Sequence, residues 1–185
     1  ELALRKDGKI LGVRMHTISD HGAFYADAQP TKFKIGLMHS TFACYDIPTA
    51  HLTSEGWYTN KAPGGVAYRC SFRVTEAMFF QERMVHAAAN DLGMDQAEFR
   101  KVNLVGDDMF PYRTAFGFLT DSGQYQKCLD VGLEAIGYDT FKQEQEEARK
   151  RGKLLGIGIS TMTEPLGAGN SREYDIIGIK MFDSA

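Results

Sequence analysis

The stretch TEAMFFQERMVHAAANDLG, residues 75–93, contains the clearest helix signal in the chain. Its apolar side chains recur every three or four residues, which is the spacing of one face of an α-helix. These side chains are Ala77, Phe80, Met84, Ala88 and Leu92. The polar face is expected to carry Glu82, Arg83, His86 and Asn90. Thr75 is the predicted N-cap and Gly93 the predicted C-cap of an amphipathic helix.

Three further helices are predicted after this stretch. Asp95 is a candidate N-cap for a short helix, and Glu98, three residues later, completes the capping-box pattern. Residues 121–123, Asp-Ser-Gly, precede a third helix. Its apolar positions and closing glycine are Cys128, Leu129, Val131, Ile136 and Gly137. Thr140 is expected to open a fourth, highly charged helix that ends at Gly152, and such a charge run indicates a solvated face.

Strand patterns lie on both sides of the helices. Residues 9–24 alternate apolar and polar side chains after the turn signal Asp7-Gly8, which predicts a hairpin arm. Other strands are predicted in four places: residues 45–48, 56–60, 154–162 and 174–181. Because strands, helices and strands follow one another in blocks, the predicted fold class is α+β rather than a βαβ repeat.

Composition excludes several classes of function. The 185 residues carry a net charge of -3, so a basic nucleic-acid-binding surface is not expected. No apolar run approaches the roughly 20 residues that a membrane helix needs. Cys44, Cys70 and Cys128 are too widely spaced for a disulfide framework or a CxxC metal site, which favours a reducing compartment. Both ends of the chain interrupt their patterns, so we expect an internal piece of a longer protein.

A glycine-rich loop before the long helix carries the candidate chemistry: GGVAYRCSFR, residues 64–73. Glycines allow the backbone to approach a ligand closely. Cys70 lies between Arg69 and Arg73, just ahead of the helix, and both cations and the helix dipole favour its thiolate form. A thiolate binds a soft metal such as Cu(I) or acts as a nucleophile. The alternative is that Cys70 is a small packing residue, which is our expectation for Cys44 and Cys128.

The run AYRCSFR, residues 67–73, resembles the active-site loop in the large subunits of aerobic, molybdenum–copper carbon monoxide dehydrogenases. These subunits belong to the xanthine oxidase-like molybdenum hydroxylases, most of which replace the cysteine, commonly by glycine. The resemblance continues through DGK at 7–9, DHGAF at 20–24, NKAPGG at 60–65, LGMD at 92–95, GIGIS at 156–160 and MFDSA at 181–185. It implies a segment of a molybdopterin-binding domain of the xanthine dehydrogenase/aldehyde oxidase type. Residues 1–151 would end the first molybdenum-cofactor-binding domain, and residues 152–185 would begin the second.

The same resemblance implies roles for five residues of the loop. Cys70 would bind Cu(I), which is bridged through sulfide to molybdenum. Arg69 would lie against the molybdenum centre, and Tyr68 would contact the cofactor beside it. Phe72 would line the substrate channel, and Ser71 would hydrogen-bond near the metal site. The alternatives are a structural ion pair for Arg69 and core packing for Phe72.

The implied reaction is the oxidation of CO with water to CO2 at a Cu–S–Mo centre. The implied cofactors are Mo-molybdopterin cytosine dinucleotide and Cu(I), with [2Fe–2S] clusters and FAD on partner subunits that receive two electrons. The implied assembly is a dimer of heterotrimers with a medium FAD subunit and a small iron–sulfur subunit. Its expected location is the cytoplasm, with at most peripheral attachment to the inner face of the cytoplasmic membrane.

Two other hypotheses stay open on the sequence. One is a molybdenum hydroxylase that acts on an aldehyde or an N-heterocycle, with Cys70 as a structural residue; copper content separates it from the first. The other is a non-catalytic interaction or scaffolding domain that uses the same fold. The flanking regions distinguish this last hypothesis from the two enzymes. The family carries its catalytic glutamate and its pterin-binding loops there, and a scaffold would lack them.

Overall fold

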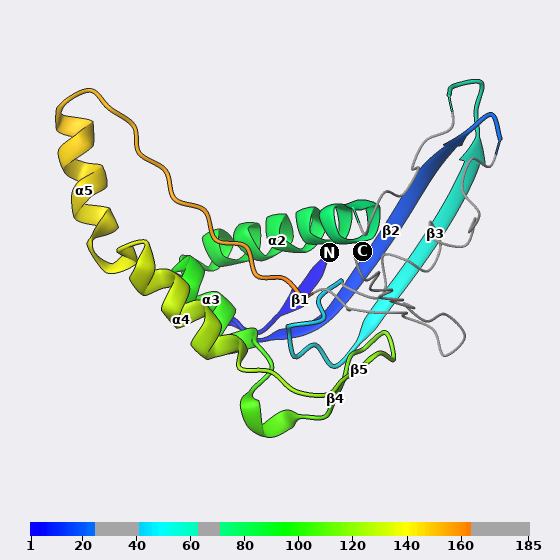
Figure 1. Ribbon diagram of the computed structural model, residues 1–185, viewed down its shortest axis with the longest axis horizontal. Helices are drawn as coiled ribbons and strands as arrows, with labels where there is room; N and C mark the ends of the chain where they lie inside the picture. Colours follow the sequence, from blue (N-terminus) through cyan, green and yellow to red (C-terminus); the bar gives the residue numbers. More distant parts are fainter. Residues whose placement is uncertain (25–40, 63–70, 164–185) are drawn as a thin grey trace, which may run out of the picture.

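The computed structural model describes residues 1–24, 41–62 and 71–163, and for residues 71–75 it describes only the backbone. Figure 1 shows how the helices and strands are arranged in space. In chain order they are β1 (Leu2–Leu4), β2 (Ile10–Gly22), β3 (Ala50–Tyr58), α2 (Ser71–Leu92), α3 (Gln96–Asn103), the 3-10 helix η2 (Asp107–Met109), β4 (Tyr112–Arg113), β5 (Leu119–Thr120), α4 (Tyr125–Ala135) and α5 (Tyr138–Lys150). Among the described elements, strands β1 to β3 come before the helices, and the short pair β4 and β5 lies between α3 and α4, so the predicted α+β class is confirmed.

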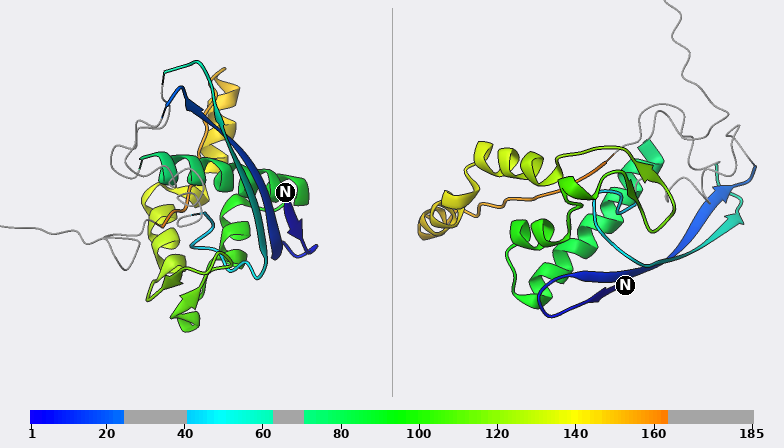
Figure 2. Two further views of the ribbon diagram at one scale, coloured as in Figure 1. Left: turned by 90° about the vertical axis from the view of Figure 1, so that its right-hand side faces the viewer. Right: turned by 90° about the horizontal axis from the view of Figure 1, so that it is seen from below.

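Strand β2 is the centre of a three-stranded sheet in the order β1-β2-β3. Strand β1 pairs with it antiparallel through the predicted turn, where Gly8 adopts φ +89° and the amide of Arg5 donates to the carbonyl of Lys9 at 2.9 Å. A positive φ is readily available to glycine, which explains the Asp-Gly signal. Helices α2 and α3 lie together on one side of this sheet in the view from below (Figure 2, right). The predicted hairpin arm is therefore confirmed, and it is part of a larger sheet.

Strand β3 corrects the prediction of two short strands at 45–48 and 56–60. One nine-residue strand, Ala50–Tyr58, pairs parallel with β2 from Val13↔Ala50 to Gly22↔Tyr58. Tyr45 makes only an isolated bridge, to Leu104. The segment has no clear apolar alternation, because most of its side chains stay exposed, and its strand form depends on the long partner β2.

Helix α2 begins at Ser71, four residues before the predicted start, so Thr75 is not its N-cap but lies inside the helix. Its predicted end is confirmed. Gly93 adopts φ +66°, and the amide of Met94 donates to the carbonyl of Ala89 at 2.9 Å, which is the bond of a Schellman C-cap.

The buried face of α2 differs from the predicted stripe. Its buried residues are Ala77, Met78, Gln81, Glu82, Val85, Ala88 and Ala89. Phe80 and Met84, which were expected in the core, are 41% and 37% exposed. Glu82, which was expected on the solvent face, is only 8% exposed, because Arg100 lies within ion-pair distance of its carboxylate. A paired and hydrogen-bonded charge tolerates burial that a lone one does not.

The helices after α2 follow the predicted order. The Asp95 carboxylate accepts from the amides of Ala97 and Glu98 at 2.8 and 3.3 Å, so the predicted N-cap of α3 is confirmed. Between α4 and α5, Gly137 adopts φ +64° and serves as the N-cap of α5. Helix α5 therefore begins at Tyr138, two residues before the predicted Thr140.

The segment after α5, residues 153–163, is not the strand predicted at 154–162. It runs back from the end of α5 toward α2 as an extended chain without strand pairing (Figure 1). Its carbonyls accept from side chains instead: Gln145 Nε2 donates to the carbonyl of Leu155 at 2.9 Å. Side-chain donors take the place of a neighbouring strand within the described residues. The strand predicted at 174–181 lies outside the described residues.

The core joins the sheet to the helices. Its buried members include Ile10 and Val13 of β2, Val85, Ala88 and Ala89 of α2, Phe99 of α3, Leu104 after it and Leu129 of α4. Asn103, which is 0% exposed, fastens the hairpin turn to α3. Its Oδ1 accepts from the amide of Ile10 at 2.8 Å, and its Nδ2 donates to the carbonyls of Gly8 and Phe99 at 2.9 Å each.

Replacing Asn103 by alanine is expected to loosen the hairpin turn. The change leaves the Ile10 amide and the Gly8 carbonyl buried without these partners, which costs about 3 kcal/mol. That cost corresponds to about 100-fold faster amide exchange in peptides that cover the turn, measured by hydrogen-exchange mass spectrometry on the full-length protein. Asn90→Ala, an exposed asparagine on α2, is the control and should leave this exchange unchanged. Equal exchange in the two variants would contradict the role of Asn103.

Candidate functional site

The predicted site lies at the start of α2. Tyr68, Arg69 and Cys70 lie outside the described residues, whereas Ser71 and Phe72 form the first two residues of the helix, as backbone. Cys70 is thus the residue directly before a 22-residue helix whose first turn carries no acidic side chain. The positive end of the helix dipole therefore favours an anion there, such as a thiolate. A single thiolate in this position fits a soft metal ion such as Cu(I).

The entry to the site loop is held by Asp20 at the end of β2. Its carboxylate accepts from Thr59 Oγ1 at 2.7 Å, from the amide of Gly22 at 2.9 Å and from Lys61 Nζ at 2.9 Å. The hydrogen bond from Thr59, with those from Gly22 and Lys61, lowers the pKa of Asp20 to about 2. Asp20 is therefore ionised at neutral pH and ties together the ends of β2 and β3, just ahead of residue 63.

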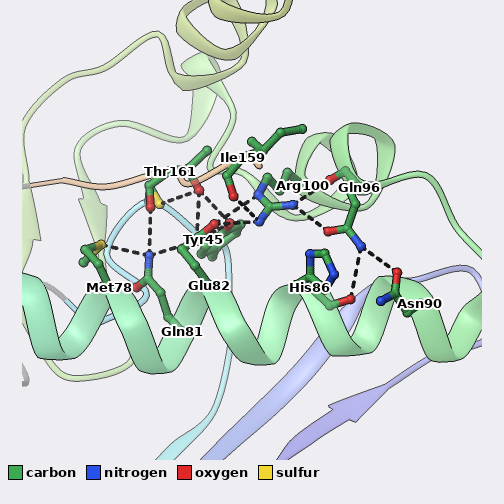
Figure 3. A network of polar contacts seen from close by, with 11 residues as sticks. Tyr45, Met78, Gln81, Glu82, His86, Asn90, Gln96, Arg100, Ile159 and Thr161 are labelled. Atoms are coloured by element: carbon green, nitrogen blue, oxygen red, sulfur yellow. Dashed lines mark hydrogen bonds and ion pairs between the residues drawn. The ribbon is translucent and has the colours of Figure 1, made fainter. Parts of the chain in front are cut away.

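The helix on the far side of the loop is held by a buried ion pair, shown in Figure 3. The Glu82 carboxylate of α2 accepts from Arg100 Nη2 at 2.8 Å and from Arg100 Nε at 3.1 Å. Its other oxygen accepts from the Tyr45 hydroxyl at 2.8 Å and from Thr161 Oγ1 at 3.2 Å. The Arg100 side chain is 1% exposed, so both charges are compensated inside the protein.

The same cluster reaches four parts of the chain. Arg100 Nη2 also donates to the carbonyl of Ile159 at 2.8 Å, and its Nη1 donates to the carbonyl of Gln96 at 2.9 Å. Gln81 Nε2 donates to the carbonyl of Thr161 at 2.9 Å, and its Oε1 accepts from the amide of Phe42. The resulting Glu82 clamp consists of Tyr45, Gln81, Glu82, Arg100 and Thr161. It connects α2, α3, the loop at residues 41–45 and the segment 153–163.

The sequence prediction missed this clamp. Gln81 and Glu82 interrupt a second helical stripe formed by Met78, Val85 and Ala89, all of which are buried. A polar pair inside an apolar stripe is the signal that could have found them, because buried polar groups need partners. Nothing local to Arg100 identifies it as that partner, since the pairing joins two helices.

The two cysteines within the described residues differ. Cys44 is buried beside the clamp, as predicted for a packing residue, and its Sγ lies 3.8 Å from Thr161 Oγ1. Burial raises the pKa of the Cys44 thiol to about 12. Cys128 was expected to pack in the same way but is exposed on α4. Its helix is short and buries only Leu129, so the apolar pattern around it overstated its burial.

Two further features of the described residues bear on function. No group of three His, Cys, Asp or Glu side chains is arranged to hold a metal ion in the parts of the chain that the structure describes. None of the helices described there is long and apolar enough to cross a membrane.

A groove of about 650 Å³ lies between β2 and α2. Glu76, Phe80 and Met84 of α2 form its helical wall.

The Cys44 thiol is expected to resist alkylation in the native protein. Its pKa of about 12 keeps it protonated between pH 7 and pH 10, and burial blocks the reagent. Iodoacetamide labelling of the full-length protein, followed by peptide mass spectrometry, should modify Cys44 only after denaturation. Fast labelling of native Cys44 near pH 8 would contradict both its burial and its raised pKa.

Comparison with known proteins identifies the family. Residues 1–104 match the family described as "Molybdopterin cofactor-binding domain". The chain is 53% identical over 187 residues to the carbon monoxide dehydrogenase large chain of Hydrogenophaga pseudoflava, covering 100% of this chain and 23% of that protein. It is 49% identical to the corresponding large chain of Afipia carboxidovorans, covering 100% of this chain and 24% of that protein.

A solved structure agrees with these relatives. The chain superposes with a TM-score of 0.79 and 45% identity on a Cu,Mo-CO dehydrogenase in its carbon monoxide reduced state, covering 98% of this chain and 24% of that one. The chain thus spans about a quarter of the length of the proteins that it matches. Its sequence over residues 1–104 and its fold agree on one assignment. The chain belongs to the molybdopterin cofactor-binding domain family, and it is similar along its length to the large chains of carbon monoxide dehydrogenases.

Proposed function

We propose that this chain is part of the large subunit of a molybdenum- and copper-containing carbon monoxide dehydrogenase. The observation that carries the proposal is that Cys70 is the residue directly before α2 in the sequence, in a chain 53% identical to a carbon monoxide dehydrogenase large chain. The proposed reaction is CO + H2O → CO2 + 2 H⁺ + 2 e⁻. In this proposal residues 1–151 end one cofactor-binding domain and residues 152–185 begin the next.

Five residues, 68–72, have a part in this proposal. Cys70 holds Cu(I) as a thiolate, which the start of α2 stabilises. Arg69 and Tyr68 contact the molybdenum cofactor. Phe72 lines the path of CO, and Ser71 hydrogen-bonds beside the metal site. The anchors described above serve these residues by holding the loop between two fixed ends.

When bound, Mo-molybdopterin cytosine dinucleotide together with Cu(I) would supply the two-electron oxidation. The residues of this chain bind it, orient it and exclude bulk water from it. The electrons leave to [2Fe–2S] clusters and FAD on a small and a medium partner subunit. We propose a dimer of such heterotrimers, located in the cytoplasm, with at most peripheral attachment to the inner face of the membrane.

A Cys70→Ala variant tests the proposal in the full-length subunit assembled with its partners. Without the thiolate, copper has no protein ligand in the loop, so copper and CO-dependent dye reduction should both fall to background. Molybdenum content and the thermal unfolding midpoint should stay as in the wild type. Cys128→Ala, which changes an exposed cysteine on α4, is the matched control and should keep metals and activity.

The second candidate is a molybdenum hydroxylase that acts on an aldehyde or an N-heterocycle, with Cys70 as a packing residue. It predicts a wild-type protein without copper that is inactive with CO and oxidises one of those substrates. That result, with Cys70→Ala equally active on the same substrate, would replace the first proposal by the second.

A further inference from the structure

We infer that Glu82 is a positioning residue for the metal ligand Cys70. It acts through the Glu82 clamp, which fixes α2 against the segment 153–163. This inference rests on the proposed function, because it assigns to the clamp the alignment of the copper-binding residue with the molybdenum cofactor. The residue does not touch the reacting atoms, so its effect is on geometry.

Because α2 is one continuous helix, fixing Glu82 also fixes the position and rotation of the start of α2. Glu82 is eleven positions after Ser71, which is a rise of about 16.5 Å along the helix axis. A slip of one residue at the clamp would advance the helix start by about 1.5 Å and turn it by about 100°. A displacement of about 1 Å at a reacting centre can cost about 100-fold in rate. The register of α2 therefore determines whether the Cys70 thiolate is at the correct position to bind copper.

Apolar packing alone does not set that register. The other buried residues of α2 are Ala77, Met78, Val85, Ala88 and Ala89, and their apolar contacts are non-directional. Gln81 and Glu82 are the two buried polar residues of α2 among those with described side chains. Their hydrogen bonds are directional and allow one axial position and one rotation.

The register of α2 is fixed relative to the segment 153–163. The carbonyls of Ile159 and Thr161 accept from Arg100 and Gln81, and Thr161 Oγ1 donates to the Glu82 carboxylate. Two of these bonds end on main-chain oxygens two residues apart, so they fix which part of the extended chain lies on α2. By the proposed boundary, this segment is the start of the second cofactor-binding domain. The clamp thus joins the helix that follows the copper ligand to the start of that second domain.

The energetics of the ion pair support a role in register. A buried ion pair adds little net stability over apolar residues of similar volume, whereas removing one partner leaves an uncompensated buried charge and is strongly destabilising. Fixing register is the best-supported use of such buried polar groups. The fully hydrogen-bonded Glu82 and Arg100 match that use.

The test uses the full-length subunit assembled with its partners and three changes at the clamp. Glu82→Gln removes one charge of the pair. The double variant Glu82→Met with Arg100→Met replaces the pair by apolar side chains. Thr161→Val replaces threonine by a side chain of similar shape that lacks the hydroxyl. This variant tests the inference even if the charge variants fail to fold. Arg83→Gln, on the adjacent exposed residue, is the matched control.

Two measurements separate positioning from stability. One is copper per molybdenum, and the other is the copper hyperfine splitting on the Mo(V) signal of the partly reduced protein, which reports the coupling of the two metals. We expect copper per molybdenum to fall at least about twofold and the splitting to change in every clamp variant that folds. In the double variant the unfolding midpoint should recover relative to Glu82→Gln, while both metal measurements remain altered. Arg83→Gln should match the wild type.

Two outcomes would overturn the inference. If a folded clamp variant, Thr161→Val included, keeps the wild-type splitting and copper content, the clamp is only structural. The same holds if copper content and splitting recover together with the unfolding midpoint in the double variant. A wild-type protein that contains molybdenum but no copper would overturn the proposed function itself, and the inference with it.

Discussion

The Glu82–Arg100 ion pair is the interaction on which four described parts of the chain converge. It is buried, and every oxygen of the Glu82 carboxylate accepts hydrogen bonds from other parts of the chain. Through it, α2 is fixed to α3, to the loop that contains Tyr45 and to the extended segment at residues 153–163. A charge pair left half-satisfied in this position would be strongly destabilising. The chain therefore accepts one arrangement of these four parts.

A second set of contacts fixes the sheet relative to this helical unit. Asn103 joins the β1–β2 turn to α3, while Asp20 ties the ends of β2 and β3 together through Thr59 and Lys61. The loop with the proposed metal ligand leaves from the strand end and enters α2. Both of its neighbours are thus anchored by hydrogen-bonded side chains, which is how a scaffold holds a reactive loop.

The proposed function combines three observations. The physical chemistry of a thiolate before a helix favours a soft metal, the family match gives a molybdopterin cofactor-binding domain, and a solved structure similar to this chain is a Cu,Mo-CO dehydrogenase. None of them alone selects the substrate, because a fold hosts many reactions. In the proposal, Cys70 is the residue that distinguishes CO oxidation from the hydroxylation of a heterocycle.

The sequence by itself determined the features that depend on near neighbours. The turn at Gly8, the C-cap at Gly93 and the N-cap Asp95 are local choices of backbone angle or hydrogen bond, and the AYRCSFR run identified the family. Only the tertiary structure decided the rest. The parallel strand β3, the burial of Glu82 and the unpaired extended chain at 153–163 all depend on partners that are distant in sequence. Periodicity reports how polar a side chain is, whereas burial depends on whether a distant group compensates that polarity.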